Sequence, residues 1–428
     1  MVNEHRILRG IRGKLLQNNS LITRADKGQT LIIITKDAYD SKIYDFLCSN
    51  DFVKISKDPT NLFTRETRKI INACKTLVPH HSKWKYTNMN PHPPNIRGLL
   101  KIHKPVIPIR PVVKWQHAPA YKIAKLLSDR LQQELQLPFN FNVKNSIHLM
   151  SELNNITPYN LNLRLASFDI SNMYTNIPTT KLPSLITEIC NNLNTPKPVR
   201  LELTKLAKMV LQQNYFSFQK DIYKQTTGLA MGAPTSAILS EIYLQYIEHT
   251  LIINILSSNN ILGYFRYVDD ILIVNDSEST NIDLVLEQFN NLTTNLNFTI
   301  EKEHNNTISF LDITIHRRPR KFDFAVYRKP TVTDHIIPND SCHPPSHKLS
   351  AIGFLTNRLN TYPISKHSKE IESKTIRHIL HANKYNNPLP PRKHFKQTDH
   401  TEPTPPKNEP SLHISAAKQQ ELLISSKN

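Results

Sequence analysis

The stretch GYFRYVDDILIV, residues 263–274, carries two adjacent acidic residues, Asp269 and Asp270, inside an otherwise apolar run. Apolar and polar residues alternate before the pair, and β-branched and leucine residues follow it, so the pattern predicts a β-hairpin with its turn at 268–270. An aspartate suits a turn because its side chain hydrogen-bonds nearby backbone. Two adjacent carboxylates repel each other, however, and each is costly to desolvate unless it is paired or bound to a metal ion.

The chain of 428 residues is strongly basic, with 54 Lys and Arg against 35 Asp and Glu, a net charge of +19 and a pI near 9.6. This balance favours a polyanionic partner, most simply nucleic acid, and a membrane surface comes second. The length gives room for two or three domains, and a hydrophobic content of 39% is enough to build their cores. Neither a long apolar run nor the apolar core of a signal peptide occurs, so we expect a soluble, intracellular protein without a membrane partner. The sequence does not choose between nucleus and cytoplasm.

The four cysteines do not indicate a disulfide framework or a zinc site. Cys48, Cys74, Cys190 and Cys342 are scattered along the chain without a CxxC pair. The stretch CHPPSH at 342–347 groups one cysteine with two histidines, but no second cluster supplies the remaining zinc ligands.

Periodicity predicts a mixed α+β chain. Residues 22–56 combine a β-branched run with a helical pattern, and the Pro-rich, basic residues 88–113 favour extended strands and loops. Residues 117–136 predict an amphipathic helix. From residue 166 onward strands, helices and hairpins alternate irregularly, which is typical of an antiparallel α+β sheet.

The C-terminal part divides into two segments. Residues 343–385 are basic and predict helices. After residue 386 the composition becomes Pro-rich, which indicates a disordered tail or a linker. No internal repeat is recognisable.

A third aspartate, Asp169 in RLASFDISNMYTNIPTT, ends another predicted strand. Carboxylates on neighbouring strands, here Asp169 and Asp269, suit a pair of divalent cations about 3.5–4 Å apart, the arrangement used for in-line phosphoryl transfer. Magnesium fits because it takes oxygen ligands and leaves room for substrate phosphates. Taken alone, Asp169 fits a helix N-cap or a turn residue better.

Glycine is scarce, with eight in the chain, and two of them, Gly228 and Gly232, lie in QTTGLAMGAPTS before a predicted helix. A loop with little side-chain bulk lets a flat base or a backbone approach closely, and Pro234 suits the start of the helix. A simple helix entry with a Ser or Thr cap is the alternative.

In their order and approximate spacing, SFDISNMYTNIP, QTTGLAMGAPTS and FRYVDD resemble the palm motifs of reverse transcriptases. The match is closest to the Penelope-like retroelement reverse transcriptases, and it covers roughly residues 20–385. The motifs of that branch are ADKG at 25–28, LLKIHK at 99–104, IRPVV at 109–113, FLDITI at 310–315, and VYRKPTVTD with SCHP within 326–344.

The resemblance implies an α+β fold with right-hand polymerase architecture, in which the palm is an antiparallel sheet and the thumb is helical. The implied domains are an N-terminal segment with fingers at 1–165, a palm with the catalytic motifs at 166–330, a thumb at 331–385 and a Pro-rich, disordered tail at 386–428.

Family roles can be carried over to the matching positions. Asp169 and Asp269 match the two metal-ligating aspartates, and Asp270 matches the second Asp of the signature. All three are thus candidate catalytic and metal residues for two Mg²⁺ ions, with Mn²⁺ as a substitute.

Six further residues match substrate-binding positions. Lys101 and Arg110 match fingers residues that hold the incoming triphosphate, although a solvated basic face is the alternative. Tyr174 matches the aromatic gate whose ring excludes a 2′-hydroxyl, although a core tyrosine is the alternative. Gln225, Gly228 and Gly232 match the loop beneath the templating base and the primer.

Two more assignments concern the primer and the leaving group. FLDITI resembles the primer-grip hairpin by its order in the chain. Lys302 lies where these enzymes often place a lysine that protonates the pyrophosphate.

The resemblance therefore implies an RNA-directed DNA polymerase, a nucleotidyltransferase whose partners are an RNA template, a DNA primer and dNTPs. The alternative is a non-catalytic nucleic-acid-binding remnant or a repurposed retroelement protein. Polymerisation of ribonucleotides is a third possibility, which Tyr174 disfavours. Many members of the branch carry a C-terminal GIY-YIG endonuclease, but residues 386–428 do not resemble one, so DNA cleavage is not expected.

Overall fold

The computed structural model of the chain describes residues 2–27, 30–48, 52–102, 104–138, 140–156, 162–319, 321–330 and 333–386. Gly28 of the ADKG motif and the predicted Pro-rich tail from residue 387 onward lie outside these ranges. The chain divides into two compact units, each assembled from separate segments. The first contains Met1–Phe139, Ser171–Ile252 and Leu292–Asn297, and the second contains Asn140–Ile170, Ile253–Asn291 and Phe298–Asn428.

The first unit contains a five-stranded sheet with the strand order β3-β8-β7-β4-β5 and a separate β1–β2 pair. The β4–β5 hairpin comes from the Pro-rich stretch 88–113, and β1, β2, α2 and β3 come from 22–56, so both sequence predictions are confirmed. The strands are β1 (Ser20–Arg24), β2 (Leu31–Thr35), β3 (Phe52–Ile55), β4 (Asn95–Leu100), β5 (Ile109–Lys114), β7 (Tyr215–Phe218) and β8 (Asp221–Gln225).

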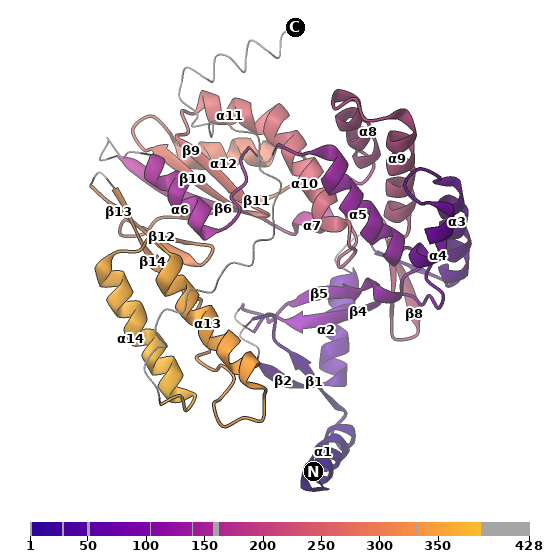
Figure 1. Cartoon of the computed structure of the whole chain (residues 1–428), viewed down its shortest axis with the longest axis horizontal. Coiled ribbons are helices and arrows are strands. Elements are labelled where there is room, and N and C mark those ends of the chain that lie inside the picture. The colour runs from indigo at the N-terminus through magenta and orange to yellow at the C-terminus, as the bar shows by residue number, and fades with distance from the viewer. Residues whose placement is uncertain are drawn as a thin grey trace. The chain divides into compact units, whose positions relative to one another are not determined.

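Helix α10 is the central helix of the first unit, since nine of its twelve residues are buried. It contacts α5, α7 and α8, and Figure 1 shows α5 beside it. The amphipathic helix predicted at 117–136 is α5, which buries Ile123, Leu127 and Leu131. The helices are α1 (Val2–Gln17), α2 (Lys36–Cys48), α3 (Thr60–Ala73), η1 (His80–Ser82), α4 (Lys83–Tyr86), η2 (Trp115–His117), α5 (Tyr121–Leu135), α7 (Met173–Asn176), α8 (Leu182–Asn192), α9 (Lys197–Gln212), α10 (Ser236–Ile247) and η3 (Glu248–Ile252).

The second unit is built on an antiparallel four-stranded sheet with the order β11-β6-β10-β9. Helix α12 covers one face of it, where the Phe289 ring packs edge-on against Phe168 and Phe298 at centroid distances of 5.4 and 5.3 Å. The elements of this unit are α6 (Ser146–Asn155), β6 (Leu163–Ile170), α11 (Ile253–Ser258), β9 (Gly263–Tyr267), β10 (Asp270–Asp276), α12 (Ile282–Asn291), β11 (Phe298–Lys302), β12 (Thr307–Phe310), β13 (Ile313–Arg318), β14 (Lys321–Val326), α13 (Pro345–Thr361) and α14 (Lys366–Ala382).

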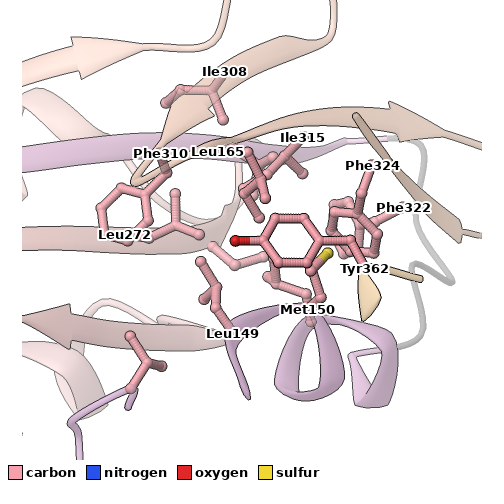
Figure 2. Packing of buried hydrophobic residues seen from close by; sticks show 14 of the residues in the cluster. Leu149, Met150, Leu165, Leu272, Ile308, Phe310, Ile315, Phe322, Phe324 and Tyr362 are labelled. Carbon is pink, nitrogen blue, oxygen red and sulfur yellow. The ribbon is translucent and has the colours of Figure 1, made fainter. Parts of the chain in front are cut away.

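On the opposite face of this sheet, the apolar core described within the second unit covers one end and leaves the other end uncovered by that unit. At the covered end, side chains of α6, β6 and β10 share one apolar core with the three-stranded sheet β12-β13-β14 and with Tyr362. Figure 2 shows Leu165 and Leu272 facing Phe310 and Ile315, with Met150 from α6 beside the Tyr362 ring and Leu149 below Leu272. The cluster does not extend to Asp169, whose side chain is exposed at the end of β6. The uncovered end of the sheet is therefore where the predicted catalytic residues lie.

The predicted helical segment 343–385 contains α13 and α14, which pack through a small core that includes Ile352, Leu355 and Ile376. None of the helices described has the combination of length and apolar composition that a membrane span requires.

Candidate active site

The predicted aspartate hairpin forms, with a tighter turn than expected. Strand β9 ends at Tyr267 and pairs with Asp270, which begins β10, so only Val268 and Asp269 form the loop. The prediction that Asp270 lies in the turn is wrong. The residue is drawn into the strand because β10 pairs with β6 as well as with β9.

The register brings two of the three aspartates directly opposite each other. Asp270 pairs with Asp169, and Asp169 pairs on its other side with Thr299 of β11. Side chains of directly opposed residues lie on the same face of a sheet, so these residues form a row with Tyr267 across all four strands. The third aspartate is attached to the same end, because the backbone carbonyl of Asp269 accepts a hydrogen bond of 3.1 Å from the amide of Ile170.

The carboxylate oxygens of Asp169 and Asp270 suit a divalent cation that also binds substrate phosphates. Across the described ranges, no three His, Cys, Asp or Glu side chains lie close enough together to hold a metal ion by themselves. Magnesium is usually held by one or two carboxylates together with substrate phosphates and water, which matches the opposed pair Asp169 and Asp270. Like charges opposite each other weaken a sheet, so this pair costs stability in the protein alone.

Two features of the hairpin could not be read from local pattern. Val268 has φ +59°, a backbone region that a two-residue hairpin requires at its first loop position but that β-branched residues rarely adopt. The side chain of Arg266 is fully buried at 1% exposure, and its guanidinium donates a hydrogen bond of 3.2 Å to the carbonyl of Val268. A buried charge therefore braces the strained turn that carries Asp269.

Replacing Val268 tests this strain. Glycine tolerates a positive φ, so Val268→Gly should be more stable to urea than Val268→Ala by about 1 kcal/mol. Val112 in β5 is the matched control, since the exposed fractions of the two side chains are 41% and 40%. At Val112 the order should reverse, with the alanine variant more stable by about 0.5–1 kcal/mol. The same order at both positions would contradict the strained turn.

The structure does not support Lys302 as the acid for the leaving group. Lys302 pairs with Ala166, which places it on the face of the sheet that α12 covers, opposite to the face of Asp169 and Asp270. Its ammonium lies 2.7 Å from the carboxylate of Asp283 on that helix. Lys302 lies on β11, which pairs with the strand of Asp169, but the alternation of side chains turns this lysine away from the aspartates.

The glycine loop packs against backbone of its own unit. Gly228 has φ +74° and Gly232 has φ +86°, and a side chain on either would collide with a backbone carbonyl, that of Thr175 or that of Val113. The amide of Leu229 also donates a 2.7 Å hydrogen bond to the carbonyl of Tyr174. The described close contacts of these glycines are therefore with the protein's own backbone, and the approach of a base or a primer to the loop stays a prediction. The loop holds the half-buried Tyr174 beside it.

Gln225 has an internal structural contact rather than an exposed side chain. It is 5% exposed, and its side-chain amide donates hydrogen bonds to the carbonyls of Thr227 at 2.7 Å and of Leu229 at 3.4 Å. The described contacts thus stiffen the loop, and a direct contact of Gln225 with template or primer stays a prediction.

The two predicted triphosphate residues both belong to the β4–β5 hairpin, Arg110 on β5 and Lys101 just after β4. Arg110 pairs with Leu99 in the β4–β5 ladder, and Lys101 follows β4 directly, its amide donating to Pro108 at 2.8 Å. Asp26, which the sequence alone did not single out, lies behind Arg110: its side chain is 1% exposed, and its carboxylate is 3.0 Å from the Arg110 Nε. The Arg110 side chain is 54% exposed. The buried Asp26 carboxylate therefore holds the Nε side of the guanidinium, while solvent reaches the rest of the Arg110 side chain.

The FLDITI hairpin has a two-residue loop like the aspartate hairpin, but its loop aspartate, Asp312, makes contacts within the protein. Its loop is Leu311, with φ +55°, and Asp312. The Asp312 carboxylate accepts hydrogen bonds from Ser146 and, at 2.6 Å, from the Tyr362 hydroxyl, and it lies 3.1 Å from Arg358. Burial and this carboxylate raise the pKa of Tyr362 to about 12. Asp312 therefore ties the predicted primer-grip hairpin to the end of α13, while its role in gripping a primer stays a prediction.

A family model described as reverse transcriptase (RNA-dependent DNA polymerase) matches residues 102–324, more than half of the chain, including the aspartate hairpin and the glycine loop. The chain belongs to the reverse transcriptase family. The prediction of an RNA-directed DNA polymerase is thereby confirmed at the level of the family. A second model, described as an animal helix-turn-helix domain, matches residues 335–394 of this reverse transcriptase, a range that includes α13 and α14.

Solved structures of telomerases have a similar fold. Telomerase from Candida albicans, in complex with a TWJ fragment of telomeric RNA, has a TM-score of 0.57 and 11% identity over 88% of this chain and 66% of that chain. Apo telomerase from Candida tropicalis has a TM-score of 0.53 and 12% identity over 86% and 66% of the two chains. This reverse transcriptase thus spans about two thirds of the length of those telomerases, and the predicted right-hand polymerase fold is confirmed. No curated protein matches its sequence.

Proposed function

We propose that this reverse transcriptase is the polymerase of a Penelope-like retroelement, which copies an RNA template into DNA from a primer 3′-hydroxyl. The observation that carries the proposal is the register that sets Asp270 opposite Asp169 at the uncovered end of the sheet. The branch is supported by the motifs outside the palm, from ADKG to SCHP, which occur in order along the chain.

Asp169, Asp269 and Asp270 would hold two divalent cations, Mg²⁺ or Mn²⁺. When bound, such ions stabilise the charge that develops on the attacking and leaving oxygens of an in-line displacement. The three carboxylates would hold these ions at the uncovered end of the sheet, and the braced turn of Val268 fixes Asp269 there. Preorganisation of this kind lowers the barrier because the groups need no rearrangement during the reaction.

The residues of the first unit would bind the nucleotide. Lys101 and Arg110 offset the charge of the triphosphate, and the ion pair with Asp26 restricts the positions that the Arg110 guanidinium takes. The backbone of Tyr174 is hydrogen-bonded to the glycine loop through Leu229, and its ring would exclude a 2′-hydroxyl and select dNTPs over ribonucleotides.

Primer extension on an RNA template tests the proposal. The purified full chain should add dNTPs to an annealed DNA primer in the presence of Mg²⁺ or Mn²⁺, and omission of the RNA template should abolish synthesis. A folded chain that binds the template–primer in a salt-dependent way, but adds no nucleotide with either ion, would refute the polymerase and favour the non-catalytic nucleic-acid-binding protein.

A further inference from the structure

Trp84 is displayed on the surface of the first unit. The chain has two tryptophans, and their exposed fractions are 68% for Trp84, in the short helix α4, and 2% for Trp115. A tryptophan ring normally contributes by burying its large apolar surface, as Trp115 does. The Trp84 ring makes no such contribution to the core.

The segments just before and just after α4 are held in place by burial and hydrogen bonds. Leu77 and Val78, just before α4, are 4% and 0% exposed, and the Ser82 hydroxyl donates a 2.9 Å hydrogen bond to the carbonyl of Pro79. On the other side, the Asn88 side chain donates a 3.1 Å bond to the carbonyl of Ala118. The ring is therefore presented from a fixed platform rather than from a loose loop, which lowers the entropy cost of binding a ligand there.

The surroundings of Trp84 are positively charged. Residues 67–128 contain twelve Lys and Arg and no Asp or Glu. Lys83 and Lys85 flank the ring in sequence, with the Lys85 ammonium 5.9 Å from the ring centroid, and the Lys122 ammonium lies 3.2 Å from the carbonyl of Thr87 at the end of α4. An acidic side chain does reach this segment from α9, but the carboxylate of Glu202 accepts hydrogen bonds from the backbone amides of Thr76 and Leu77.

We propose that Trp84 is a stacking platform for single-stranded nucleic acid, with a base on the exposed ring and its phosphates near Lys83, Lys85 and Lys122. An exposed aromatic ring among cations matches such a ligand, because unpaired bases offer flat faces and the nucleic-acid backbone is a polyanion. A duplex does not offer these faces, since its bases are stacked on one another. The site differs from the predicted catalytic and dNTP-binding residues, so it goes beyond the proposed polymerase function and does not depend on synthesis.

Intrinsic fluorescence of the full chain tests the proposal, because Trp84 is the accessible emitter and Trp115 is buried. Single-stranded uridine and deoxythymidine oligonucleotides should quench the emission, whereas a duplex of equal length should not. The emission of the buried Trp115 is the internal reference. In Trp84→Phe this emission should not be quenched, although the oligonucleotide should still bind because phenylalanine also offers an aromatic face. Stronger quenching by one of the two oligonucleotides identifies whether the ligand is RNA or DNA.

Affinity measurements complete the test. Replacement of the ring in Trp84→Leu should weaken binding of a labelled single strand by about tenfold, a typical effect of losing one stacked base. Leu201→Ala is the matched control, since Leu201 on α9 is also exposed, at 57%. The inactive double variant Asp269→Asn/Asp270→Asn should be quenched like the parent, so this result is independent of polymerase activity. Absence of quenching, equal quenching by duplex, or quenching by anionic vesicles alone would overturn the proposal.

Discussion

Asp169→Asn should abolish primer extension and at the same time leave the protein at least as stable as the parent. Loss of one carboxylate removes several kcal/mol of stabilisation from the transition state, which corresponds to a rate lower by about a thousandfold or more. Asp169 lies directly opposite Asp270 in the ladder, so the same change also removes a repulsion between like charges. Removal of such a pair should raise the free energy of unfolding by about 0.2–1 kcal/mol.

The opposite signs of the two effects make this prediction specific. A residue of ordinary structural importance would lose activity because it loses stability. Asp283→Asn is the matched control: it removes an aspartate from α12, the helix on the other face of the sheet, and breaks an exposed ion pair with Lys302. Extension by this variant should match the parent, and its stability should change by less than about 1 kcal/mol. Parallel losses of activity and stability in Asp169→Asn would contradict the assignment of Asp169.

Gly228→Ala should destabilise the first unit and impair the use of dNTPs. Its positive φ disfavours any side chain, and the new methyl group would collide with the carbonyl of Thr175. Together, the backbone strain and the overpacking should lower the free energy of unfolding by about 2–4 kcal/mol. The shift of the loop should also move Tyr174, whose backbone carbonyl accepts a hydrogen bond from the amide of Leu229. Urea unfolding and the KM for dNTP measure the two effects.

Gly353→Ala is the control for this substitution. Gly353 lies within α13, and an added methyl group there would meet open space. Alanine is the better helix former, so this variant should gain about 0.5–1 kcal/mol. A Gly228→Ala variant as stable as the parent would show that the loop does not need glycine at this position.

Local pattern was sufficient for several of the elements. The alternation of apolar residues predicted the hairpin at 263–274, and the amphipathic spacing at 117–136 predicted α5. The boundary of the aspartate turn was wrong by one residue because Asp270 resembles a turn former when only its neighbours are considered. Its place in the strand follows from pairing with β6, about a hundred residues earlier in the chain, and no local pattern contains that information.

Besides strand pairing, local pattern also could not predict which polar side chains are buried. An arginine in a half-polar strand is normally exposed, yet Arg266 is buried under the turn that it braces. Asp26 belonged to a recognised motif, but its buried contact with Arg110 joins a turn and a strand that lie far apart in sequence. The scarcity of glycine pointed to a close approach at Gly228 and Gly232, and only the structure identified the backbones that approach.

The segmented construction of the two units has a consequence for the gene. The chain passes from one unit to the other after residues 139, 170, 252, 291 and 297, and the last segment belongs to the second unit. A premature stop codon anywhere before residue 298 therefore truncates both units at once. A copy whose reading frame begins after residue 140 likewise lacks parts of both. Neither the aspartate hairpin with its sheet nor the glycine loop with its supporting strands can be inherited as a separate, uninterrupted piece of coding sequence.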